Sequence, residues 1–307
     1  MFQDRKNHAP LMPDRTALPT SARRALRVVL AFNPASGRFR PRALARLREA
    51  MEAAGHRVRC ESSRDFRFDG PGDPVDVVCA FGGDGTARTV ISENSANADR
   101  ATYCVYPAGT INLIAREARY PDEPARFTRL LHERSAAMPH YYGTIGDDAF
   151  LCCASVGPDA EVVARVSTRL KRHIGQLAYG VALLGLLWKW PRRPFEAEID
   201  GVRHTGEALF VCNGRYYAGP WVIDPAARLV DDHFRILLMP RARRRDMLRL
   251  AISAVISPAL GDNRWVRVSG RLITVSGAAD MPIQADGDVV AATPATISIA
   301  PAPLHFL

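Results

Sequence analysis

Between residues 27 and 137, short apolar runs alternate with helical stretches, and this alternation constrains the fold more than any other feature of the chain. Apolar, β-rich runs occur at 27–32, 75–81 and 102–107. Each run ends in a turn rich in Gly, Pro or Asn, and residues with helical character follow. Strand, loop and helix repeated in this order predict a parallel sheet with helices on its faces.

The three loops that follow these strands have unusual chemistry: NPASG (33–37), GGDGT (82–86) and PAGTIN (107–112). In a parallel sheet they emerge at the same edge, where open α/β sheets bind ligands. Glycines let backbone N–H groups approach phosphate oxygens, and helix N-termini add a partial positive charge. One Gly-rich turn is ordinarily just a turn, but three at corresponding positions indicate an anion site. Neither a Walker A motif nor G-x-G-x-x-G occurs.

After about residue 137 the chain changes to short strands separated by turn residues, which predicts an antiparallel sandwich or barrel. Two helices are expected within it, near 159–190 and 241–256. We therefore divide the chain into a flexible tail (1–26), an α/β domain (27–137) and a β-rich domain (138–307). The expected strands of the last domain are 141–146, 149–155, 194–201, 206–213, 232–239, 264–270, 272–277 and 295–300.

The charge and the cysteines restrict the partners and the compartment. The net charge of +9 favours an anionic partner, but the sequence shows no nucleic-acid recognition pattern. The six cysteines form neither a metal nor a disulfide pattern, so we expect buried free thiols in a reducing compartment. The longest apolar run, 177–188, is shorter than the roughly 20 residues that a bilayer-spanning helix needs. We expect a soluble, cytoplasmic protein.

Taken together, the three loops resemble those of the diacylglycerol kinase catalytic-domain family, which includes bacterial diacylglycerol kinases and the sphingosine and ceramide kinases. The resemblance continues through SVGPDAEVV (155–163), DPAARLVDDHFRI (224–236) and IQADGDVV (283–290). It covers nearly everything outside the tail. GGDGT alone also occurs in NAD kinases, so the ordered set is the more specific signal. The resemblance implies an α/β nucleotide-binding domain, a β-rich sandwich domain for the lipid substrate, and ATP-dependent, Mg²⁺-assisted phosphoryl transfer in the cleft between them.

The resemblance also implies roles for individual residues. Asp231 lies where bacterial members bind magnesium, with the carbonyls of Arg228 and His233 at companion positions. Asp286 or Asp288 would be the base that activates the lipid hydroxyl, and the sequence does not choose between them. Because like charges repel, Asp84 is expected to hold Mg²⁺ or a water bound to it rather than phosphate. The residues expected to bind ATP are Asn33, Pro34, Ser36, Gly37, Gly82, Gly83, Asp84, Gly85, Thr86, Gly109, Thr110 and Asn112.

Four positions depart from the family pattern. Leu113 stands where many members have Asp, Pro158 replaces Phe, and Asp232 replaces Gly. Asp288 replaces Glu and is one methylene shorter. The last departure bears on the choice of base, and together the four leave open a catalytically weak member.

Two basic segments bear on membrane association. The stretch 171–193 has an apolar centre with Trp and basic ends, which suits either a helix at a membrane interface or a buried helix. The cluster at 240–249 could attract anionic lipid or form a solvated helix face. We expect a cytoplasmic lipid kinase at the inner membrane surface, acting on a diacylglycerol, sphingoid or ceramide lipid. The alternatives are a kinase of a soluble substrate, as in NAD kinases, or a non-catalytic nucleotide-binding membrane protein. The oligomeric state stays open.

Overall fold

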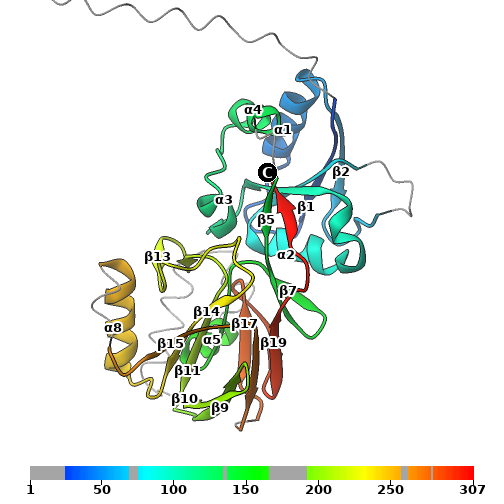
Figure 1. Cartoon of the computed structure of the whole chain (residues 1–307). Helices are drawn as coiled ribbons and strands as arrows, with labels where there is room; N and C mark the ends of the chain where they lie inside the picture. The colour runs from blue at the N-terminus through cyan, green and yellow to red at the C-terminus, as the bar shows by residue number, and fades with distance from the viewer. Residues whose placement is uncertain (1–24, 69–74, 134–136, 166–191, 257–261, 278) are drawn as a thin grey trace, which may run out of the picture.

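The computed structural model of the chain describes residues 25–68, 75–133, 137–165, 192–256, 262–277 and 279–307 (Figure 1). Residues 1–24 of the predicted tail and residues 171–191 of the stretch 171–193 lie outside these residues. Within them, no helix is both long and apolar enough to cross a membrane.

The first sheet contains the parallel strands predicted from the alternating pattern. Its strand order is β2-β1-β3-β4-β20-β5, and the first four strands run parallel. Its helices pack by apolar stripes: in α1, Leu44, Leu47 and Met51 are buried at helical spacing, and Pro41 occupies the first turn, where no N–H is needed. The elements in chain order are β1 (Arg27–Phe32), α1 (Pro41–Ala53), β2 (Arg57–Ser62), β3 (Val77–Gly82), α2 (Asp84–Ser92), the 3₁₀ helix η1 (Ser95–Arg100), β4 (Thr102–Pro107), α3 (Leu113–Glu117) and α4 (Pro124–Glu133).

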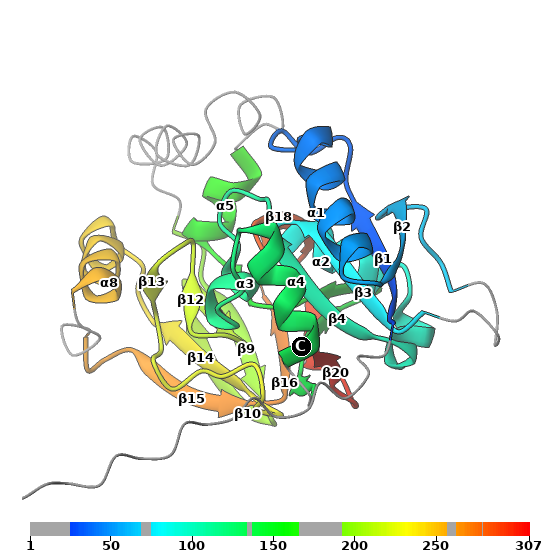
Figure 2. The ribbon, with the colours of Figure 1, turned by 90° about the horizontal axis from the view of Figure 1, so that it is seen from above.

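Two further strands of this sheet come from the second half of the chain. β20 (Leu304–Phe306) pairs parallel to β4 and antiparallel to β5 (Met138–His140). The last residue, Leu307, donates its amide to the Tyr103 carbonyl at 2.9 Å. The chain thus returns to the first sheet at its end, a sheet membership that the sequence analysis did not anticipate (Figure 2).

The second half forms two facing sheets, as the short strands predict. Alternation explains how each sheet buries one side: in β9, Phe195, Ala197 and Ile199 point inward and the two glutamates between them are exposed. One sheet has the order β10-β9-β16-β19-β6-β7 and the other β15-β14-β11-β8-β17-β18. The strands of the first are β10 (Val202–Gly206), β9 (Phe195–Ile199), β16 (Leu272–Ser276), β19 (Ala295–Ile299), β6 (Gly143–Ile145) and β7 (Asp148–Phe150). Those of the second are β15 (Val266–Gly270), β14 (Phe234–Met239), β11 (Ala208–Cys212), β8 (Cys153–Val156), β17 (Pro282–Ala285) and β18 (Asp288–Ala292). The predicted fold class, an α/β domain followed by a β-sandwich, is confirmed.

Several element boundaries differ from the sequence-based expectation. The stretch 149–155, expected as one strand, is divided between β7 and β8, because the chain turns at Leu151 and Cys152, where backbone amides bond to a distant carboxylate described below. Of the helix expected at 159–190, α5 (Pro158–Arg165) is described. The helix expected at 241–256 is α8 (Arg244–Val255). A two-stranded ribbon, β12 (Tyr216–Tyr217) with β13 (Trp221–Val222), was not expected.

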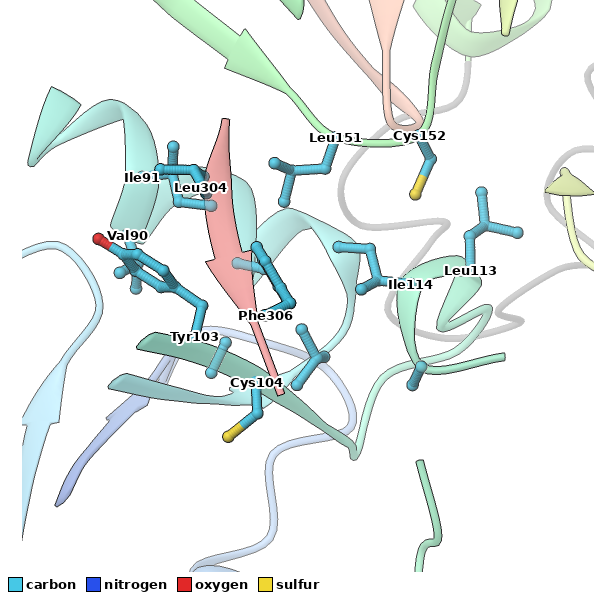
Figure 3. Close-up of a cluster of buried hydrophobic side chains, with 14 of the residues drawn as sticks. Val90, Ile91, Tyr103, Cys104, Leu113, Ile114, Leu151, Cys152, Leu304 and Phe306 are labelled. Atoms are coloured by element: carbon cyan, nitrogen blue, oxygen red, sulfur yellow. The ribbon is translucent and has the colours of Figure 1, made fainter. Parts of the chain in front are cut away.

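The two domains share one apolar core. Leu151 and Cys152, from the turn between β7 and β8, belong to the same buried cluster as Val90, Tyr103 and Ile114 of the first domain. Figure 3 shows this cluster, with Leu304 and Phe306 of β20 among its members. A second cluster fills the space between the two sandwich sheets. The six cysteines are free thiols, five of them buried, as predicted.

Candidate functional site

The three loops of the anion-site prediction begin at the same edge of the first sheet. β1 and β4 are the two neighbours of β3, so the loops that follow these strands are also neighbours. Gly82 lies opposite Pro107 in the sheet, and the Ala108 amide donates to the Gly82 carbonyl at 3.0 Å. The carboxyl ends of adjacent parallel strands are where α/β folds bind ligands.

The glycines of these loops serve two purposes. A Cβ atom on Gly109 would lie 2.5 Å from the Gly83 Cα, and one on Gly82 would lie 2.2 Å from the Thr86 Oγ1. Gly83 and Gly109 therefore let two of the loops pack on each other, and Gly82 leaves room for Thr86 within its own loop. Gly85 differs, because the nearest atom to an added Cβ is a carboxylate oxygen of Asp288 at 3.7 Å. Gly85 thus lies beside a residue that the sequence predicted to be catalytic.

Two asparagines shape the loops from within. The Asn33 Oδ1 accepts from the Ala35 amide at 3.0 Å. Asn112 has a left-handed backbone (φ 56°), and its side chain accepts from the Gly109 amide and donates to the Gly109 carbonyl. Both predicted nucleotide-binding asparagines therefore hold loop conformation in this structure. Thr110 is exposed at the rim, whereas Thr86 is buried.

Helix α2 starts directly from the GGDGT loop, with Gly83 as its N-cap. The first amides of a helix have no partner within the helix, and its N-terminus has partial positive charge. At Gly83 to Gly85 these amides lie at the sheet edge where the three loops meet. This is a suitable arrangement for a phosphate group.

Asp84 is buried and binds backbone amides. Its two carboxylate oxygens accept from the Leu113 amide at 2.8 Å and the Ile114 amide at 3.0 Å, so it caps the N-terminus of α3. Burial raises the pKa of Asp84 to about 6, although these two bonds favour the ionised form. Each oxygen thus accepts from one amide and holds the start of α3. The Mg²⁺ role of Asp84 stays a prediction, and we derive no step through a metal at this residue.

Asp286 has the same kind of environment in the second domain. Its carboxylate accepts from the amides of Leu151 at 2.6 Å, Cys152 at 2.9 Å and Cys153 at 3.0 Å. Its backbone is left-handed (φ 48°), and burial raises its pKa. Three amides around one carboxylate explain why the chain turns between β7 and β8. We call Asp84 and Asp286 the amide-bound carboxylates.

Asp288 lies two residues further along the same turn and has a different environment. Its side chain is 49% exposed and accepts from Arg88 of α2 at 3.0 Å. Arg88, whose side chain is 14% exposed, also bonds to Asp148 of β7 at 3.2 Å. We call Arg88, Asp148 and Asp288 the ion cluster. It joins the helix of the GGDGT loop to the second domain and leaves the Asp288 carboxylate accessible to solvent beside Gly85.

Comparison with known proteins agrees with this architecture. Residues 27–139 match the diacylglycerol kinase catalytic domain, and residues 152–307 match the YegS C-terminal NAD kinase beta sandwich-like domain. The chain is 32% identical to a probable lipid kinase YegS-like of Pseudomonas fluorescens strain Pf-5 over 68% of this chain and 69% of that one. It is 26% identical to a diacylglycerol kinase of Bacillus subtilis strain 168 over 85% and 89% of the two chains. The crystal structure of a putative diacylglycerol kinase from Bacillus anthracis Sterne has a TM-score of 0.72 at 20% identity and covers 92% of this chain and 96% of that chain.

The chain belongs to the diacylglycerol kinase and YegS-like lipid kinase family.

The positions at which this lipid kinase departs from its family have local partners. Leu113 is buried and donates its amide to Asp84, and Pro158 is a buried first residue of α5. Asp232 bonds to Arg271 and His233 at the surface. Asp288 pairs with Arg88. The departures therefore fit the fold, and the two amide-bound carboxylates do not depend on them.

The predicted magnesium residues of the lipid kinase lie on one turn before β14. The Asp231 amide donates to the Arg228 carbonyl at 3.0 Å, which keeps the predicted carboxylate near a predicted carbonyl ligand. Oxygen ligands of this kind suit Mg²⁺. In the part of the chain that the structure describes, no three His, Cys, Asp or Glu side chains form a metal-binding cluster. The metal role of Asp231, Arg228 and His233 stays a prediction.

A buried polar network supports the turn that holds Asp286 and Asp288. The Gln284 Oε1 accepts from the Gly287 amide at 3.0 Å, and its Nε2 donates to the Tyr217 hydroxyl at 3.1 Å. Tyr217 in turn donates to Asp159 of α5, which also accepts from Ser155 at 2.6 Å. The network thus connects α5 and the ribbon to the turn that holds Asp286 and Asp288.

Sequence reasoning missed Arg88 and Gln284. Arg88 had a usable signal, because a basic residue one helical turn after Asp84, in the helix that starts from a Gly-rich loop, lies near the candidate phosphate site. Gln284 had none, since its partner Tyr217 is 67 residues away and in a ribbon that the pattern did not predict.

Proposed function

We propose that the protein transfers the γ-phosphoryl group of ATP to the hydroxyl group of a lipid of the diacylglycerol, sphingoid or ceramide type, at the point where the GGDGT loop meets Asp288. The observation that supports this most is the solvent-accessible Asp288 carboxylate against Gly85. Phosphoryl transfer from ATP requires a phosphate site and a nearby group that accepts the hydroxyl proton. Both features meet here, across the two domains.

Asp288 is the base in this proposal, and Asp286 is a positioning residue. A general base must reach the proton that it abstracts and have an oxygen available for it. The Asp286 oxygens accept from three backbone amides, whereas Asp288 is half-exposed. Arg88 orients the Asp288 carboxylate and adds positive charge beside the phosphate site.

The nucleotide phosphates would bind at the N-terminus of α2 and along the neighbouring loops. The amides of Gly83 to Gly85 supply donors there, and Ser36, Gly37 and Thr110 lie partly or fully exposed on the adjoining loops. Asp231 and the carbonyls of Arg228 and His233 would hold a Mg²⁺ ion through oxygen ligands, and Mg²⁺ would supply positive charge to the reaction. The protein's own contribution is orientation, backbone donors and the proton acceptor.

The test is phosphate transfer from γ-labelled ATP to a panel of lipid alcohols in detergent micelles: diacylglycerol, ceramide, a sphingoid base, and NAD as a soluble acceptor. We expect label in one class of lipid and none in NAD. Label in NAD alone would replace the proposal with the soluble-substrate alternative. ATP binding without label in any acceptor would replace it with the non-catalytic one.

A further inference from the structure

Helix α8 lies on the outside of the sandwich domain, beside the strand β13 (Figures 1 and 2). Its inner side is well packed: Leu250 and Ser253 are buried, and Asp246 is buried where it bonds to the Arg243 amide at 3.1 Å. The helix is therefore fixed to the domain, and its outer side is a defined surface rather than a frayed segment.

The outer side of α8 exposes large apolar side chains in a row. Leu248, Ile252 and Ile256 follow one another at intervals of four residues and are 62%, 42% and 71% exposed. Residues four apart lie on the same face of a helix. β13 contributes a further exposed apolar residue nearby, Trp221, at 40% exposure. Single exposed apolar side chains are ordinary, but an aligned row beside an exposed Trp indicates a surface that binds something.

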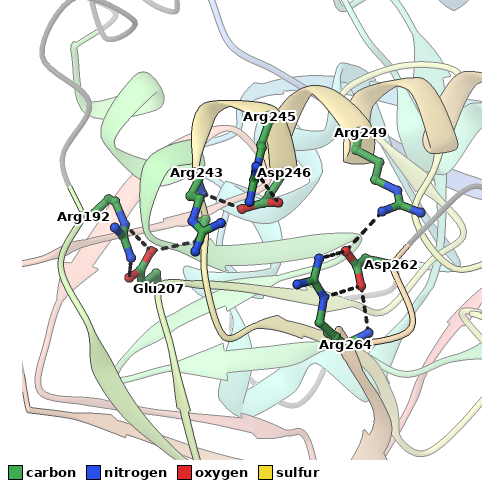
Figure 4. Close-up of polar contacts among 9 residues, drawn as sticks. Arg192, Glu207, Arg243, Arg245, Asp246, Arg249, Asp262 and Arg264 are labelled. Atoms are coloured by element: carbon green, nitrogen blue, oxygen red, sulfur yellow. Dashed lines mark hydrogen bonds and ion pairs between the residues drawn. The ribbon is translucent and has the colours of Figure 1, made fainter.

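Arginines lie on α8 and on the segments next to it. Arg192 pairs with Glu207, Arg245 lies 3.9 Å from Asp246, and both Arg249 and Arg264 pair with Asp262 (Figure 4). The positive groups exceed the carboxylates, and the exposed Arg241 and Arg244 add to the excess. Several of these guanidinium groups are themselves well exposed, with Arg245 at 69% and Arg264 at 76%. The helix that carries the apolar row thus has an excess of positive charge on it and beside it.

We propose that the outer face of α8, with Leu248, Ile252, Ile256 and the neighbouring Trp221, docks on an anionic lipid bilayer. An amphipathic helix with apolar side chains between arginines inserts at the headgroup level of such a membrane, where Trp also partitions. Basic residues near the surface attract anionic headgroups. The inference deepens the proposed function, on which it rests, by naming the surface that brings a lipid kinase to a substrate within a membrane.

Charge decides between a bilayer and a second copy of this chain. A symmetric dimer through this face would set the same patch against itself, so arginines would face arginines. An anionic bilayer instead supplies the opposite charge over its whole area. The chain's net charge of +9 acts in the same direction. The observations therefore favour the membrane as the occupant.

The test uses the full chain and vesicles of phosphatidylcholine with or without phosphatidylglycerol. We expect cosedimentation with the anionic vesicles, and slowed amide hydrogen exchange in residues 244–256 when they are added. The double variant Leu248→Gln/Ile252→Gln should bind these vesicles about tenfold more weakly or worse, since both apolar contacts are lost. The matched control Val202→Gln/Leu272→Gln changes two exposed apolar residues of the other sandwich sheet and should bind like the wild type.

Three outcomes would overturn the inference: unchanged hydrogen exchange in α8 when wild-type protein is bound to vesicles, equal vesicle binding by both double variants, or a dimer in light scattering that only the α8 variant dissociates.

Phosphorylation of a short-chain, monomeric lipid alcohol separates this inference from the proposed function. If the α8 variant keeps that activity and loses activity on vesicles, both stand. If the wild type phosphorylates no lipid yet docks through α8, the proposed function fails alone.

Discussion

Acidic residues of the GGDGT loop and of the turn at 286–288 occupy two contrasting regions. Asp84 and Asp286 are the amide-bound carboxylates, each accepting from two or more backbone N–H groups, while the half-exposed Asp288 belongs to the ion cluster with Arg88 and Asp148. Asp286 and Asp288 are separated by one glycine, yet their oxygens face different surroundings. The motif therefore contains two carboxylates with different partners, backbone amides for Asp286 and an arginine for Asp288.

The contrast also explains how the two domains are joined. Asp84 fixes the start of α3, and Asp286 fixes the turn at Leu151 and Cys152, whose side chains lie in the core shared with the first domain. Buried carboxylates cost free energy unless hydrogen bonds satisfy them, and backbone amides do so here. The ion cluster crosses the same junction at its solvent side. Replacing an amide-bound carboxylate should lower the free energy of unfolding. Replacing Asp288 of the ion cluster should lower the rate of phosphoryl transfer.

The largest expected loss of stability follows Asp286→Asn. The Asn side chain would present an NH₂ group to backbone donors and would lose the charge that strengthens three bonds, so we expect about 3 kcal/mol of destabilisation. Urea unfolding measures it. Asp280→Asn is a matched control, since Asp280 is exposed and also has a left-handed backbone (φ 56°), and it should change stability little. If Asp286→Asn and Asp280→Asn had the same free energy of unfolding, the three amides around Asp286 would not stabilise the fold.

Asp84→Asn should cost less, about 1–2 kcal/mol, as expected for loss of a helix cap. The cost should also depend on pH. Burial raises the folded-state pKa of Asp84 from 3.8 to about 6. Between these two pH values the folded protein therefore binds more protons than the unfolded chain does. The contribution of Asp84 to the free energy of unfolding is therefore fully present below about pH 4, and it is lost as the pH rises through about 6.

Thermal unfolding across this range, on wild type and Asp84→Asn side by side, checks the sign. The stability difference should be larger at low pH than at neutral pH. The exposed Asp99 serves as the control position for an Asp-to-Asn change outside the core. If the stability difference between wild type and Asp84→Asn grew toward neutral pH, burial would not be the cause of the raised Asp84 pKa.

Gln284→Leu should cost about 1–2 kcal/mol, because its side chain loses two hydrogen bonds, one to the Gly287 amide and one to the Tyr217 hydroxyl. Without the Gln284 side chain the Gly287 amide loses its partner, and the turn at 286–288 is held less firmly. We therefore expect a lower kcat and an unchanged KM for ATP. Tyr217→Phe is the companion variant: it removes the other end of the network and leaves the Gly287 bond intact. If both variants lower kcat equally, Gln284 does not orient the turn.

The sequence predicts the fold well where structure is local. β1 and β4 occur where their apolar runs predict them, because strands buried on both faces have few alternatives. β5 and β20 were not predicted to join the first sheet, since each is three residues long and its partners are far away in the sequence. The break at Leu151 was missed for the same reason: the carboxylate that stabilises it lies 135 residues later.

The candidate site divides in the same way. The sequence locates the three loops and the turn at 286–288, because short motifs record them. It does not distinguish Asp286 from Asp288, since the amides that surround one and the arginine that pairs with the other come from different elements. It also assigns Asp84 to a metal on the ground of repulsion from phosphate, without the α3 amides that the fold places against it. Contacts over long sequence separation decide these roles.

The most direct test of the account is the single-turnover rate of phosphoryl transfer by Asp288→Asn at saturating ATP, measured with its urea unfolding curve. Loss of a general base costs about 100-fold or more in rate. The account predicts such a loss with wild-type stability, and a much smaller loss in the matched variant Asp148→Asn, which removes the other carboxylate bound to Arg88. A fully active Asp288→Asn enzyme, or one whose rate falls only as far as its stability does, would contradict it.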